Sequence, residues 1–125
     1  MTYQILVAED EIECRVVLKE AIADIDSSTE IVTVGNGSEA VEQATSRDFD
    51  LIVMDLHVEE MSGIEALKVI HMSEPDLPIL VAAETDDDDK KTEALTGGAS
   101  IILTKPLDLS EFTSAVRKLL GIRIT

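Results

Sequence analysis

The apolar residues of this chain gather in five short runs, separated by longer stretches of mixed polarity. The third run, residues 51–54, is unbroken and is followed at once by Asp55. Short unbroken apolar runs are typical of strands that are covered on both faces of a parallel sheet. The sequence therefore predicts strands at residues 4–8, 31–34, 51–55, 79–83 and 101–104.

Between these runs the apolar residues recur about every 3.6 positions, as they do on one face of an amphipathic helix. In the first such stretch the apolar positions are Ile12, Val16, Leu18, Ile22 and Ile25. The pattern predicts helices at about residues 12–23, 38–46, 64–74, 86–97 and 110–121.

Sequence signals mark several helix ends. Asn36 or Ser38 is expected to cap the second helix and Ser110 the last one, because their side-chain oxygens accept hydrogen bonds from free backbone N–H groups. Gly63 is expected to supply backbone freedom where the loop after Asp55 turns into the third helix.

Strands that alternate with helices predict an α/β fold, in which helices cover both faces of a mostly parallel sheet. The strand order 2-1-3-4-5 would give a flavodoxin-like, doubly wound (βα)5 arrangement, a three-layer sandwich. The 125 residues suffice for one core, so residues 1–125 are expected to form one domain. Ligands of such folds bind beyond the carboxyl ends of the strands, where Glu9–Asp10, Asp55 and Lys105 would converge.

Charge and composition exclude several classes of partner. Ten basic and 26 acidic residues give a net charge of −16, which repels nucleic acid and anionic lipid. No apolar run approaches the length that crosses a bilayer, and the N-terminus lacks a signal-peptide pattern, so a cytoplasmic protein is expected. With one cysteine, Cys14, and no Cys/His cluster, neither an internal disulfide nor a zinc site is expected.

The three acids predicted at the strand ends suggest a specific chemistry. Close carboxylates repel one another, so Glu9, Asp10 and Asp55 need a cation to hold them in one crevice. Mg²⁺ fits, because it prefers oxygen ligands and is usually held by one or two carboxylates plus a phosphate oxygen. An aspartate between Mg²⁺ and the Lys105 ammonium is suited to forming an acyl phosphate, since both cations offset the charge of a transferred phosphoryl group.

The whole chain resembles the receiver domain of bacterial two-component response regulators. The joint order and spacing of several short motifs carry this resemblance, and they are Glu9–Asp10, Asp55, Gly63, Gly98–Ala99 and Lys105–Pro106. The resemblance implies a phosphorelay signalling domain that assists its own phosphorylation and dephosphorylation but is not otherwise an enzyme. Its implied partner is a sensor histidine kinase or phosphotransfer protein, and a homodimer through the last two helices is a further possibility.

The same resemblance assigns roles to individual residues. Asp55 would accept the phosphoryl group from a phosphohistidine, and Lys105, joined to Pro106 by a cis peptide bond, would contact that group. Mg²⁺, or Mn²⁺ in its place, would be held by Asp10 directly, by Glu9 largely through water, and by the main-chain carbonyl of His57. The His57 imidazole has no expected catalytic role.

The chain departs from the family pattern at positions that couple phosphorylation to conformational change. Ala83 stands where the family usually has a threonine or serine, and Ile102 where it often has a tyrosine or phenylalanine. Glu84 replaces a small residue, and Glu59 replaces a loop proline. We therefore expect Asp55 to accept a phosphoryl group, while the usual coupling through a hydroxyl and an aromatic ring is absent or replaced.

Three other functions deserve comparison. A phosphorylation-independent interaction module on the same fold would explain the atypical switch positions Ala83 and Ile102, but not the intact acids and lysine. A haloacid-dehalogenase-like phosphatase needs a second acid two residues after its nucleophile, where this chain has His57, and it needs a cap domain. A flavodoxin-like nucleotide binder needs a glycine-rich phosphate loop, which does not follow the first strand.

Overall fold

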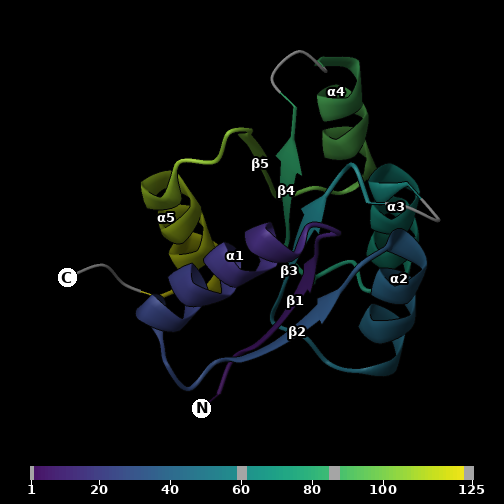
Figure 1. Cartoon of the computed structure of the whole chain (residues 1–125). Coiled ribbons are helices and arrows are strands. Elements are labelled where there is room, and N and C mark those ends of the chain that lie inside the picture. The colour runs from purple at the N-terminus through teal and green to yellow at the C-terminus, as the bar shows by residue number, and fades with distance from the viewer. Residues whose placement is uncertain (1, 59–61, 85–87, 123–125) are drawn as a thin grey trace.

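The computed structural model describes residues 2–58, 62–84 and 88–122, and it consists of alternating strands and helices (Figure 1). The strands are β1 (Gln4–Ala8), β2 (Glu30–Val34), β3 (Leu51–Asp55), β4 (Ile79–Ala83) and β5 (Ile101–Thr104). The helices are α1 (Ile12–Ile25), α2 (Gly37–Ser46), α3 (Gly63–Ser73), α4 (Asp88–Gly97) and α5 (Leu109–Leu120).

The strands form one parallel sheet in the order β2-β1-β3-β4-β5, which confirms the predicted flavodoxin-like topology. Helices α1 and α5 cover one face of this sheet, and α2, α3 and α4 cover the other (Figure 1). All carboxyl ends of the strands lie at one edge, because every pair is parallel. Strands β1 and β3 are neighbours there, at the point where the strand order reverses.

The central strands β3 and β4 are covered by helices on both faces of the sheet. Every residue of β3 and β4 is buried. Successive side chains of a strand point to opposite faces, so Ile52 and Met54 join the core under α2, α3 and α4, whereas Leu51 and Val53 join the core under α1 and α5. The unbroken apolar run therefore places Asp55 at the centre of the carboxyl edge.

The apolar pattern of α1 predicts more buried residues than the structure shows. Its buried residues are Leu18, Ala21 and Ile22, whereas Ile12 and Val16 are 73% and 49% exposed. The reason is the face of the helix on which they lie: at 3.6 residues per turn, Ile12 and Val16 are roughly 120° and 160° around the axis from Leu18. These two apolar side chains consequently face solvent.

The structure selects one of the two predicted caps of α2 and corrects the predicted cap of α5. Asn36, rather than Ser38, caps α2, and its side chain accepts a hydrogen bond from the Glu39 N–H. The last helix is capped by Asp108 and not by Ser110, because α5 already begins at Leu109. The Asp108 carboxylate accepts hydrogen bonds from the N–H groups of Ser110 and Glu111.

Gly63 has a different role from the predicted one. It is not among the described glycines with positive φ, which are Gly98 and Gly121. A Cβ at Gly63 would lie 2.6 Å from the Leu56 Cα and 2.7 Å from the Asp55 main-chain oxygen. Glycine is required because α3 starts against the backbone that follows β3, rather than for conformational freedom.

Candidate functional site

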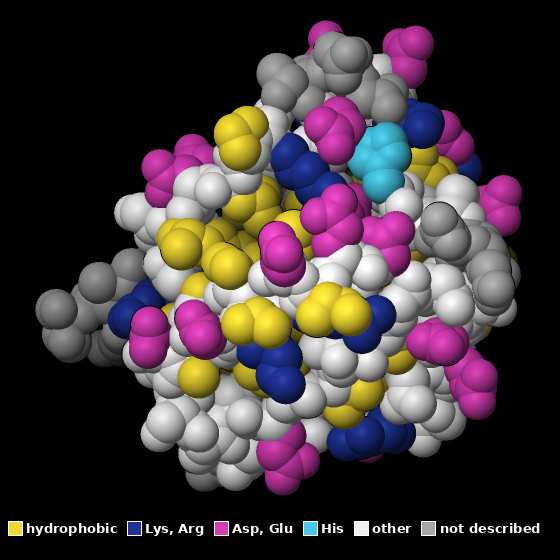
Figure 2. Space-filling view, in the orientation of Figure 1, with side chains coloured by type: hydrophobic (Ala, Val, Ile, Leu, Met, Phe, Trp, Pro, Cys, Tyr) yellow, Lys and Arg dark blue, Asp and Glu magenta, His cyan; other side chains and the backbone are white. Residues whose placement is uncertain are grey.

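The predicted site residues meet at the carboxyl edge of the sheet. Asp55 ends β3, Glu9 and Asp10 directly follow β1, and Lys105 directly follows β5. Acidic side chains gather beside a histidine and basic side chains on the face shown in Figure 2. A hollow of about 560 Å³ opens there, and Glu9, Glu84 and Lys105 contribute to its lining.

Asp55 is buried, and it forms hydrogen bonds through both of its carboxylate oxygens. Lys105 Nζ donates to Oδ2 at 2.7 Å, and the His57 main-chain N–H donates to Oδ1 at 2.9 Å. Burial by itself would raise the pKa of Asp55, but the hydrogen bonds from Lys105 and His57 outweigh it, so this pKa lies below its ordinary value. Asp55 is therefore ionised at neutral pH.

Glu9 lies beside Asp55 and behaves in the opposite way. Only 4% of it is exposed, and its Oε1 accepts a hydrogen bond from the Glu11 N–H at 3.1 Å. Burial, followed by the hydrogen bond to Asp55, raises the pKa of Glu9 to about 8. When the two acids share a proton, Glu9 is favoured to carry it, because Asp55 accepts hydrogen bonds from Lys105 and His57.

The pKa of Lys105 is raised although the side chain is partly buried. Burial alone would lower it, but the hydrogen bond to Asp55 and the charges of Asp55, Glu9 and Glu84 have the larger effect. Lys105 is thus a stable cation, held against the aspartate that would receive a phosphoryl group.

The acids fit a divalent cation with oxygen ligands. One carboxylate oxygen each from Glu9, Asp10 and Asp55 lies within 4.8 Å of the others, in the only such group found among the described residues. Ligand oxygens at about 2.1 Å from one Mg²⁺ ion lie up to roughly 4.2 Å apart. Oxygens this close together suit one Mg²⁺ ion that also keeps several water ligands.

The atypical positions lie in different surroundings. Ala83 is buried at the end of β4, and its main-chain oxygen accepts the Lys105 N–H at 2.8 Å. Ile102 is partly buried and packs on the core under α2, α3 and α4. The His57 imidazole extends toward Glu84, with Nε2 3.8 Å from Oε1. The Lys105–Pro106 peptide bond is cis, and Glu59 lies outside the described residues.

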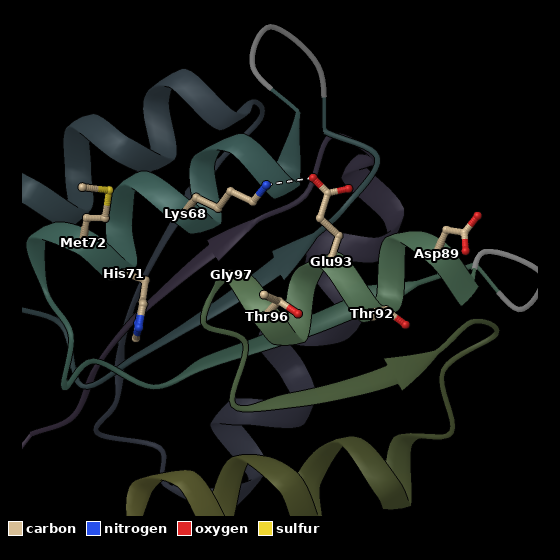
Figure 3. A pocket seen from close by; sticks show the side chains of 8 residues that line it. All are labelled: Lys68, His71, Met72, Asp89, Thr92, Glu93, Thr96 and Gly97. Atoms are coloured by element: carbon tan, nitrogen blue, oxygen red, sulfur yellow. Dashed lines mark hydrogen bonds and ion pairs between the residues drawn. The ribbon is translucent and has the colours of Figure 1, made fainter.

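A larger hollow, of about 630 Å³, lies between α3 and α4 (Figure 3). An ion pair crosses it, with Lys68 Nζ 2.8 Å from Glu93 Oε1. None of the predicted site residues lines it, and both partners of the ion pair are about half exposed. The predicted site residues Glu9 and Lys105 line the smaller hollow instead.

Sequence reasoning missed Arg15. Its Nε donates a hydrogen bond to the main-chain oxygen of Glu9 at 2.6 Å. The available signal was a basic residue six positions after Glu9, in an otherwise acidic stretch at the start of α1. That signal does not indicate the partner, because the contact depends on how α1 turns back over the end of β1.

The family model for the response regulator receiver domain matches residues 5–117. The chain belongs to this family. Receiver domains of this kind are the signalling modules of two-component response regulators.

Curated relatives are considerably longer than this receiver domain. The chain is 34% identical over 107 residues to the transcriptional regulatory protein ZraR of Klebsiella oxytoca. The aligned region covers 86% of this chain and 24% of ZraR. It is 39% identical over 107 residues to a protein-glutamate methylesterase/protein-glutamine glutaminase of Thermotoga maritima. That alignment covers 82% of this chain and 30% of the relative. The receiver domain thus spans about a quarter to a third of the length of these relatives.

Solved structures share the fold. The receiver domain of sensor histidine kinase PA1611 from Pseudomonas aeruginosa, with a magnesium ion coordinated in its active site cleft, has a TM-score of 0.86 at 22% identity, covering 97% of this chain and 99% of that one. A CheY-like receiver domain protein from Methanospirillum hungatei has a TM-score of 0.89 at 17% identity, covering 97% and 95%. Within the described part of this receiver domain, no helix has the length and apolar character of a membrane span.

Proposed function

We propose that residues 1–125 act as one phosphorelay receiver, in which Asp55 accepts a phosphoryl group from a sensor histidine kinase or a phosphotransfer protein. One observation carries this proposal: the buried Asp55 carboxylate lies 2.7 Å from the Lys105 ammonium, with Glu9 and Asp10 beside it. An ionised aspartate is a nucleophile, and the ammonium offsets the charge of an incoming phosphoryl group.

Mg²⁺ is the proposed cofactor, and Mn²⁺, which takes the same oxygen ligands, would serve as well. Asp10, Asp55 and the main-chain carbonyl of His57 would hold the ion, with Glu9 acting largely through water. When bound, the ion supplies positive charge that offsets the charge on the transferred phosphoryl group. The magnesium ion in the receiver domain of PA1611 supports this choice of metal.

The residues of this chain would act in the transfer as follows. An oxygen of Asp55 forms the new O–P bond while the P–N bond of the donor phosphohistidine breaks, and the donor imidazole keeps the electron pair. Lys105 Nζ, now 2.7 Å from Asp55 Oδ2, would contact the phosphoryl oxygens. The hollow lined by Glu9, Glu84 and Lys105 gives the donor access.

Intact mass spectrometry tests the proposal. After incubation with acetyl phosphate and Mg²⁺, the protein is expected to gain one phosphoryl group, about 80 Da, by the chemistry of aspartate nucleophiles. Asp55→Asn removes the nucleophile and is expected to show no gain. Asp50→Asn, an exposed aspartate at the opposite edge of the sheet, is the matched control and should be labelled like the unaltered protein. Absence of the adduct in the unaltered protein would contradict the acceptor role.

The residues at the two switch positions favour a second function on the same fold, an interaction module that does not need phosphorylation. Ala83 is buried at the end of β4 and offers no hydroxyl that could follow a phosphoryl group. Ile102 likewise has no ring or hydroxyl. The alternative is therefore an interaction module that binds its partner, or a second copy of itself, through α4 and α5 without phosphorylation.

NMR with beryllofluoride, which mimics the phosphoryl group, separates the two functions. For a receiver with a replaced switch, we expect amide shifts at Asp55 and Lys105 together with shifts in α4 and β5. For the interaction module, partner binding would be equally tight with and without beryllofluoride, and shifts would stop at the site. Asp55→Asn should abolish every beryllofluoride shift in either case.

A further inference from the structure

Arg15 joins two loops at the carboxyl edge of the sheet. Its Nε donates to the Glu9 main-chain oxygen at 2.6 Å, and its Nη2 lies where a Cβ on Gly35 would be only 2.6 Å away. Glu9 begins the loop from β1 into α1, and Gly35 begins the turn from β2 into α2. One side chain therefore spans the loops that follow two neighbouring strands.

The hydrogen bond acts on the peptide group that leads into Asp10. A peptide group is planar, so the direction of the Glu9 C=O also sets the direction of the Asp10 N–H and Cα. The preceding peptide group is held as well, because the Glu9 N–H donates to the Val34 oxygen at 3.0 Å. Arg15 and the Val34 oxygen thus hold the two peptide groups of Glu9, and with them the backbone position from which the Asp10 side chain extends.

The turn behind the guanidinium is itself held by hydrogen bonds. The Gly35 N–H donates to Glu39 Oε2 at 3.2 Å, and the Glu39 N–H donates to Asn36 Oδ1 at 2.8 Å. Asn36 thus caps α2, and the Glu39 side chain returns to the backbone N–H one residue before that cap. Because Gly35 has no side chain, the guanidinium lies directly against this backbone, which limits its movement away from Glu9.

We propose that Arg15 is a positioning residue for the divalent cation. The carboxylates of Glu9, Asp10 and Asp55 repel one another when ionised, and Asp10 is the exposed member, whereas Glu9 and Asp55 are held by burial. Mg²⁺ requires nearly ideal octahedral geometry, so its carboxylate ligands must be held close to their final positions. Arg15 supplies this hold from outside the ligand set. The inference rests on the proposed function, since it concerns binding of the ion at that site.

Two substitutions of nearly equal size separate the hydrogen bond from the bulk of the side chain. Arg15→Met fills similar space but has no donor, whereas Arg15→Gln has an amide nitrogen at the position of Nε. Lys19→Met, which removes a cation one turn further along α1, is the matched control. The measurements are the Mg²⁺ dissociation constant by titration calorimetry, amide hydrogen exchange at Asp10 in the metal-free protein, and the Tm.

For Arg15→Met we expect the Mg²⁺ dissociation constant to rise about tenfold, in the range typical of lost partners of metal ligands. We also expect faster exchange of the Asp10 amide. Arg15→Gln should recover most of both effects, and Lys19→Met should match the unaltered protein. The inference is overturned if Arg15→Met lowers only the Tm, or changes neither the dissociation constant nor the exchange rate. If the unaltered protein binds no Mg²⁺, the proposed function itself is contradicted, and this inference with it.

Discussion

Replacing Lys105 with methionine is expected to lower the free energy of unfolding by about 2–3 kcal/mol at pH 7 in the absence of metal. The substitution leaves Asp55, which is 3% exposed, without its cation, and loss of one partner from a buried ion pair typically costs a few kcal/mol. We place the value below the upper range because the Lys105 side chain is itself 24% exposed. Urea denaturation measures it directly.

The ion pair between α3 and α4 provides a matched control. Lys68 and Glu93 are 2.8 Å apart, almost the same distance as Lys105 and Asp55, but their side chains are 46% and 50% exposed. Lys68→Met is expected to cost less than about 1 kcal/mol, as exposed pairs do. The Lys105→Met loss should also shrink in an Asp55→Asn background, because the carboxylate charge is then gone. Equal losses at Lys68 and Lys105 would contradict this account.

The metal-free receiver is expected to lose stability as the pH rises from about 6 to 9. Glu9 has an ordinary pKa of 4.5 when unfolded and a pKa of about 8 when folded. A pKa raised by folding gives stability that is fully present below the unfolded value and is lost as the pH passes the folded value. Each unit of pKa difference corresponds to about 1.4 kcal/mol, so the Tm should fall by several degrees across this range.

Glu9→Gln tests the source of this pH dependence. Glutamine cannot titrate, so the Tm of this variant, measured in the presence of a chelator, should be nearly flat between pH 6 and 9. Glu13→Gln, which changes an exposed glutamate on α1, should keep the slope of the unaltered protein. A slope that persists in Glu9→Gln would assign the titration to another group. The lowered pKa of Asp55 predicts a separate loss of stability only at acid pH.

Local sequence patterns predicted the strands and helices well. They failed for one helix cap and for the buried face of one helix. The apolar run before Asp55 indicated a strand buried on both faces, and β3 is buried throughout. Ser110 had the chemistry of a cap, but Asp108 lies one residue before α5 and takes that place. Ile12 had a helical spacing to Val16, yet both face solvent because they lie on the other side of α1 from its buried residues, Leu18, Ala21 and Ile22.

The sequence by itself determined the order of strands and helices, the parallel topology and the placement of Glu9, Asp10, Asp55 and Lys105 at strand ends. Hydrophobic period and turn residues act over a few positions, so a single chain displays them. Only the tertiary structure decided how deeply Asp55 is buried, how close Lys105 comes to it, and why the pKa values of Glu9 and Asp55 move in opposite directions. Asp55 and Lys105 are 50 positions apart, and their burial and separation arise only when β3 and β5 enter the same sheet. The same holds for Arg15, whose partner is determined by the path of α1 over β1.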